Sequence, residues 1–183
     1  SSIAAGDSIE FTLDGCVDMA IPGDYTLTVY TSYSGDANSS NDSLTVSVTN
    51  VGLCTPEADC SYGDGMTSFE FADISNLDSG CSELGYGDYT DLTTDLLQGE
   101  TYDMTFSSGY GTQVFRVWID YNDDFVFSLD ELIVDNPVLA NGEGPGDYSG
   151  TLPVEIPSDA SLGQHMMRVK SNYGALVPDD ACE

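Results

Sequence analysis

Acidic side chains are concentrated in the stretch VWIDYNDDFVFSLDEL, residues 117–132. Residues 120–131 can be aligned with a twelve-residue calcium loop, whose ligands stand at positions 1, 3, 5, 7, 9 and 12, with a backbone carbonyl at position 7. Oxygen groups fill all six positions: Asp120, Asn122, Asp124, the Val126 carbonyl, Ser128 and Glu131. Hard oxygen donors suit a hard cation, and calcium tolerates irregular geometry better than magnesium. The spacing therefore predicts a calcium site.

Phe125 departs from this pattern, because position 6 of such a loop is normally a glycine with positive φ. Either the loop turns differently or the site is weakened. Against this, five carboxylates crowd the loop without a local Lys or Arg to offset their repulsion: Asp120, Asp123, Asp124, Asp130 and Glu131. A bound cation would relieve that repulsion. The alternative is a solvated acidic hairpin without an ion.

A second group of acidic and amide side chains lies in GDANSSND, residues 35–42, and offers a weaker cation site formed by Asp36, Asn38, Asn41 and Asp42. Asp and Asn also favour turns for backbone reasons alone. A turn without a cation is therefore the competing interpretation.

The charge balance excludes whole classes of partner. The chain has 32 acidic residues and 3 Lys or Arg residues, for a net charge of −29. Nucleic-acid binders need clustered basic residues, and anionic lipid headgroups would be repelled, so we expect neither nucleic-acid binding nor direct membrane insertion. No apolar run is long enough to span a membrane.

Catalytic groups are poorly represented. His165 is the only histidine and lies in a strand-like pattern, QHMMRVK, and no GxSxG nucleophile motif is present. We therefore expect a protein that is not an enzyme. Arg116 and Arg168 are predicted to pair with carboxylates, because an isolated buried charge is costly.

Short alternating segments separated by Gly, Asn, Asp and Pro recur along the chain, which is typical of strands. They predict strands in residues 24–33, 42–51, 101–110, 113–120 and 164–173. The expected fold class is all-β, an antiparallel β-sandwich. We place a boundary near residues 50–54, with a partial immunoglobulin-like β module in residues 1–52 and a complete β-sandwich domain in residues 53–183.

A family resemblance covers the second domain. Residues 54–183 resemble the GEVED domain in the stretches CSYGDGMTSFEFADISNLDSGC, GYGDYTDL, LLQGETYDMTFSSGYGTQVFRVWIDYNDDFVFSLDELI and VEIPSDASLGQHMMRVKSNYG. The segment PGDYTLTVYTSYSGDANSSNDSLTVSVTN is similar to the closing half of an adhesion-type immunoglobulin-like domain. The resemblance implies a non-catalytic adhesion or substrate-targeting module of a larger secreted or cell-surface bacterial protein. The spacing of the acidic loop adds the expectation that calcium stabilises this module.

The partner expected from the resemblance is an extracellular polysaccharide or protein surface. Two alternatives stay open. One is a carbohydrate-binding module of a polysaccharide-degrading enzyme, for which the surface candidates are Tyr110, Tyr121 and Tyr148. The other is a subunit of an extracellular fibre, in which a neighbouring copy supplies the missing strands.

Five cysteines and a near-absence of lysine suggest a secreted protein with disulfides. Cys60 and Cys81 bracket a predicted hairpin, and a bond between them would close a loop of about 20 residues. We expect this bond together with one between Cys54 and Cys182, which leaves Cys16 over. Connectivity does not follow from the sequence alone.

Overall fold

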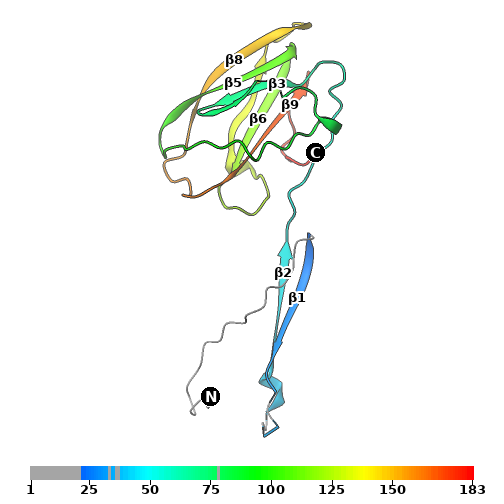
Figure 1. Ribbon diagram of the computed structural model, residues 1–183, viewed down its shortest axis with the longest axis vertical. Helices are drawn as coiled ribbons and strands as arrows, with labels where there is room; N and C mark the ends of the chain where they lie inside the picture. The colour runs from blue at the N-terminus through cyan, green and yellow to red at the C-terminus, as the bar shows by residue number, and fades with distance from the viewer. Residues whose placement is uncertain (1–21, 33, 36–37, 78) are drawn as a thin grey trace. The chain divides into compact units, whose positions relative to one another are not determined.

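The computed structural model describes residues 22–32, 34–35, 38–77 and 79–183. Contacts divide the chain into two units, Ser1–Gly52 and Leu53–Glu183. The described residues are all-β, apart from three short 3-10 helices (Figure 1). None of their helices is long and apolar enough to cross a membrane.

The described residues of the first unit form an antiparallel hairpin. Strand β1 (Gly23–Tyr30) pairs along its whole length with β2 (Ser43–Asn50), and η1 (Ser39–Asn41) lies in the connection. Most side chains of both strands are exposed, so the hairpin has little core of its own. Cys16, which the expected disulfide pairing leaves over, lies outside the described residues.

The second unit is an antiparallel β-sandwich, as the sequence predicts (Figure 1). One sheet has the order β4-β3-β5-β8 and the other has the order β7-β6-β9. The strands and short helices are β3 (Met66–Phe71), β4 (Ile74–Asn76), η2 (Glu83–Gly85), β5 (Thr101–Tyr110), β6 (Gln113–Asp120), η3 (Leu129–Glu131), β7 (Leu132–Leu139), β8 (Pro145–Glu155) and β9 (Met166–Tyr173).

All eight residues of β6 are buried, which explains the nearly continuous apolar run in QVFRVWID. Alternate side chains point to opposite faces of a strand. Phe115, Val117 and Ile119 therefore enter the core between the two sheets, where the Phe106 ring stacks on Phe115 with centroids 4.6 Å apart. Trp118 enters a smaller second core on the outer face of the sheet.

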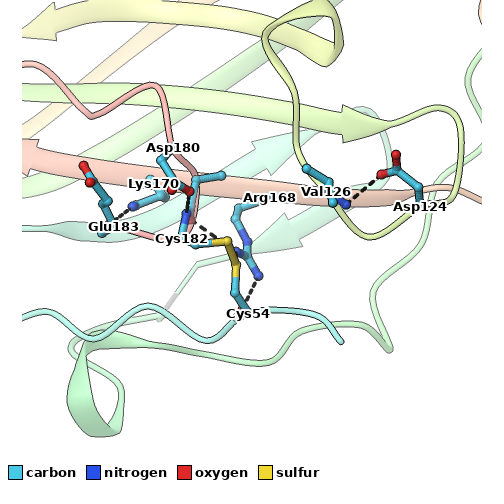
Figure 2. Close-up of a disulfide and its surroundings, with 9 residues drawn as sticks. Cys54, Asp124, Val126, Arg168, Lys170, Asp180, Cys182 and Glu183 are labelled. Carbon is cyan, nitrogen blue, oxygen red and sulfur yellow. Dashed lines mark hydrogen bonds between the residues drawn. A yellow bond between two sulfur atoms is a disulfide. The ribbon is translucent and has the colours of Figure 1, made fainter. Parts of the chain in front are cut away.

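Two disulfides stabilise this unit, as expected from the cysteine content. Cys60 is bonded to Cys81. Cys54 is bonded to Cys182 (Figure 2). The second bond holds the C-terminal segment over the outer face of β6. Val177 and Ala181 from this segment cover Trp118, which is fully buried there.

The two arginines differ in their partners. Arg116 pairs with Asp135 at 2.8 Å and with Asp179 at 2.6 Å, as predicted. The prediction for Arg168 is wrong, since the ion pairs of the described residues do not include it.

Arg168 instead donates hydrogen bonds to backbone carbonyls. One goes to Cys54 at 2.5 Å (Figure 2), and the other goes to Ala181 at 3.2 Å. Its guanidinium carbon lies 4.6 Å from the centre of the Phe127 ring. Neutral carbonyl dipoles and an aromatic face thus replace the expected carboxylate.

Candidate metal site in the acidic loop

The acidic loop begins at the last residue of β6. Asp120 is 1% exposed, and its carboxylate accepts hydrogen bonds from the backbone N–H groups of Asp124 (3.2 Å) and Phe125 (2.9 Å). The chain therefore folds back around one buried carboxylate. The loop ends in η3, which packs against β6.

The next two candidate ligands repeat this turn chemistry. The Asn122 side-chain oxygen accepts from Asp124 N–H at 2.9 Å, and the Asp124 carboxylate accepts from Val126 N–H at 2.8 Å (Figure 2). Short polar side chains that bond to the backbone two residues later are typical of tight turns. The spacing in the sequence thus becomes a compact loop with oxygens at positions 1, 3 and 5.

Phe125 adopts the conformation that position 6 normally assigns to glycine. Its φ is 62°, in the left-handed region, and Asp123 at position 4 has a φ of 58°. Of the two alternatives that the sequence raises, a different turn at this residue is therefore wrong. The phenyl group is 40% exposed, so solvent accommodates the side chain while the backbone makes the turn.

Glu131 at position 12 is buried, with 5% of its surface exposed. One carboxylate oxygen accepts bonds from the Ser128 N–H and hydroxyl groups, both at 3.0 Å, and the other is buried without a hydrogen-bond partner. None of the ion pairs among the described residues involves Asp120 or Glu131. A buried carboxylate oxygen without a partner is costly, and a cation would satisfy it.

The backbone of the loop forms a hydrogen-bonded turn, but its acidic side chains are not gathered at one point. Among the residues that the structure describes, no three Asp, Glu, His or Cys side chains are gathered closely enough to hold a metal ion. The Asp124 N–H group is shared by the Asp120 and Asn122 side chains, whereas the Asp124 carboxylate accepts from Val126 N–H. Ser128 donates to Glu131. The Val126 carbonyl is supplied by the same loop.

His165 provides a contact that the sequence did not reveal. Its Nδ1 lies 3.0 Å from the Asp123 carboxylate and its Nε2 lies 3.0 Å from the Ser161 carbonyl oxygen. Burial lowers the pKa of His165, but the Asp123 hydrogen bond and charge and the nearby carbonyls raise it, and the net shift is upward. The imidazole thus fastens the acidic loop to the segment that precedes β9.

The second cation candidate contains a turn. Asn38 caps η1, and its side-chain oxygen accepts from the Ser40 hydroxyl at 2.6 Å and from the Ser40 N–H at 3.4 Å. Asn41 donates its N–H to the Asn38 carbonyl at 3.5 Å, and the Asp42 carbonyl accepts from Thr31 N–H. Asp36 lies outside the described residues.

The three tyrosines proposed as a ligand surface are not neighbours in the fold. Tyr110 and Tyr148 lie on the adjacent strands β5 and β8. Tyr121 directly follows Asp120, the last residue of β6. Tyr121 packs partly against the main core, and burial raises its pKa. The structure thus places Tyr110 and Tyr148 in one region and Tyr121 in another, and each stays a separate candidate for contact with a ligand.

The match to a known family covers the C-terminal part of the second unit. Residues 114–183 match the GEVED domain. The matched part of the chain runs from β6 to Glu183 and includes the whole acidic loop, the His165 contact and the Cys182 half of the terminal disulfide. No curated protein and no solved structure matches the chain.

Proposed function

We propose that residues 53–183 form a non-catalytic, calcium-stabilised extracellular module, used for adhesion or substrate targeting by a larger secreted or cell-surface protein. The partly immunoglobulin-like residues 1–52 would belong to a neighbouring adhesion module. The GEVED match, the two disulfides and the β-sandwich support the extracellular assignment. Its partner would be a polysaccharide or protein surface.

The observation that carries the calcium proposal is the conformation of residues 120–131. The loop has a buried carboxylate at position 1, a left-handed residue at position 6 and a buried Glu131 oxygen without a partner. Calcium takes six to eight oxygen ligands in flexible geometry. Binding requires the carboxylate side chains of the loop to move closer together, because no three of them are gathered as they stand.

The role of the ion would be structural. Adjacent carboxylates in one loop repel one another, and a divalent cation replaces that repulsion with attraction. A ligand that binds only the folded state stabilises it by about 2.7 kcal/mol at a free concentration of 100 times Kd. Calcium would thereby hold the loop, and through Asp123 and His165 the segment before β9, in one conformation.

The test compares two acidic residues of the same loop. Melting temperatures are measured in EDTA and in excess calcium for the native chain, for Asp124→Asn and for the matched control Asp130→Asn, whose side chain is exposed and stands at no ligand position. We expect calcium to raise the melting temperature of the native chain and of Asp130→Asn, with the increase largely lost in Asp124→Asn.

An unchanged melting curve of the native chain would contradict the proposal. Equal responses of the two variants would also contradict it, because they would indicate general screening of the acidic surface. Magnesium at the same concentration separates a calcium site from an unspecific divalent effect, since magnesium demands a stricter octahedral geometry.

A further inference from the structure

A small aromatic hollow lies where the loop after Cys60 meets the ends of β5 and β9. It has a volume of about 320 Å³ and is lined by Tyr62, Asp64, Tyr110 and Tyr173. This volume is at the lower end of the range for small-molecule sites. The hollow shares no residue with the acidic loop, and only Tyr110 is among the residues that the sequence indicates.

The tyrosines form a corner. The rings of Tyr110 and Tyr173 have centroids 5.1 Å apart and planes at 83° to each other. Tyr62 and Tyr173 are 82% and 49% exposed, so their rings are accessible to a ligand. Perpendicular rings suit a compact, rounded group that touches several π-faces, whereas a flat sugar ring stacks best on a flat platform.

The Asp64 carboxylate makes the hollow favour positively charged ligands. One oxygen of its carboxylate is buried and has no hydrogen-bond partner. Burial of such an oxygen is costly unless a donor or a positive charge compensates it. The chain has only four basic side chains, and each is engaged elsewhere: Arg116, His165, Arg168 and Lys170. No basic side chain of the chain therefore compensates Asp64, and a cation from outside the chain would do so.

The loop that carries Tyr62 and Asp64 is held in place before any ligand arrives. The Cys60–Cys81 disulfide anchors its start. Gly63 lies against β5 so closely that a Cβ atom on Gly109 would be 2.9 Å from the Gly63 carbonyl oxygen. Such preorganisation lowers the entropy cost of binding.

We propose that this hollow binds a small organic ammonium group, with the cation over the tyrosine faces and beside the Asp64 carboxylate. Aromatic rings attract an alkylated ammonium within about 6 Å of their centres. A calcium ion would need six to eight oxygens, and Asp64 is the only carboxylate in the lining. The ligand class is thus an alkylammonium head, such as that of choline.

The experiment uses choline and its neutral isostere 3,3-dimethyl-1-butanol, titrated into the full chain and followed by NMR. Saturating calcium is present throughout, and sodium chloride keeps the ionic strength constant. We expect choline to shift the tyrosine resonances of the hollow and the neutral isostere to leave them unchanged. Equal binding of the two compounds, or no binding of choline, would overturn the proposal.

Two variants and two matched controls locate the site. Asp64→Asn and Tyr62→Ala should each weaken choline binding by on the order of tenfold, through the lost charge and the lost ring. The controls Asp91→Asn and Tyr30→Ala change an exposed acid and an exposed tyrosine outside the hollow and should bind normally. Equal weakening by Asp64→Asn and Asp91→Asn would overturn the proposal, because diffuse attraction to the acidic surface would then explain binding. Tyr62 is largely exposed, so its variant remains informative if Asp64→Asn folds poorly.

Discussion

Phe125 has a backbone conformation that an L-residue with a large side chain adopts at a cost. A left-handed φ costs such a residue roughly 1–2 kcal/mol relative to the right-handed region. The surrounding hydrogen bonds to Asp120 and Asp124 maintain it. The strain energy resides in the backbone. Because the phenyl ring is partly exposed, its packing offsets little of this energy.

We therefore predict that Phe125→Gly raises the unfolding free energy by about 1 kcal/mol, because glycine reaches positive φ without a Cβ clash. The same variant should bind calcium more tightly. Urea denaturation in EDTA and calorimetric titration measure the two effects. Phe125→Val is the control and should be destabilised, since a β-branched residue is poorly suited to this φ. Destabilisation of Phe125→Gly to the same extent as Phe125→Val would contradict this explanation.

His165 predicts a pH dependence of stability near neutrality. Its pKa is raised in the folded chain, so its contribution is fully present below the unfolded pKa of about 6.5 and is lost as the pH rises through the higher folded pKa. We expect the native chain to lose stability above pH 6.5 relative to His165→Gln. Urea denaturation at a series of pH values in EDTA measures this. Asp123→Asn should remove the same dependence, and an unchanged pH profile in both variants would contradict the Asp123–His165 contact.

At the scale of single residues, the sequence indicates the residues of the acidic loop but not their long-range neighbours. The candidate ligand positions follow from spacing within twelve residues. The His165 contact joins residues 42 apart and depends on the pairing of β6 with β9. The carbonyl partners of Arg168 depend on the position of the C-terminal segment, and no local pattern encodes it.

At the scale of elements, the sequence predicts most of the strands and misses β8. All five predicted windows contain strands, and the predicted hairpin between Cys60 and Cys81 contains β3 and β4. Strand β8 was not predicted, because Pro145 and Pro153 interrupt its pattern. Both β8 and the proline-containing β7 lie at sheet edges, where a missing N–H group is tolerated.

The Cys60–Cys81 bond joins residues 21 positions apart, and the segment between them includes β3 and β4. Loop closure of this length restricts the unfolded chain and is worth roughly 3 kcal/mol. We predict that the double variant Cys60→Ser, Cys81→Ser loses about this much unfolding free energy, measured by urea denaturation without reductant. The variant should also bind choline less tightly, because the loop of the aromatic hollow loses its anchor. Unchanged stability would show that the bond does not constrain the unfolded chain.

At the scale of the whole chain, a net charge of −29 opposes compaction. Salt screens this repulsion, with a Debye length of about 8 Å at 0.15 M. We predict that sodium chloride raises the melting temperature in EDTA, steeply at low concentration and less above about 0.15 M. Micromolar to millimolar calcium should add a further increase at constant ionic strength. A melting temperature that does not depend on sodium chloride would contradict a role for general repulsion.

The Cys54–Cys182 bond has a mechanical consequence. It joins residues 128 apart, close to both limits of the β-sandwich unit. A pulling force applied to the chain before Cys54 and after Cys182 therefore passes through a covalent bond and bypasses the sheets. The segment that the bond closes would reach about 430 Å if it were fully extended, and the bond prevents that extension. Under tension the unit would transmit load as a rigid link, and reduction of one disulfide would turn it into an extensible one.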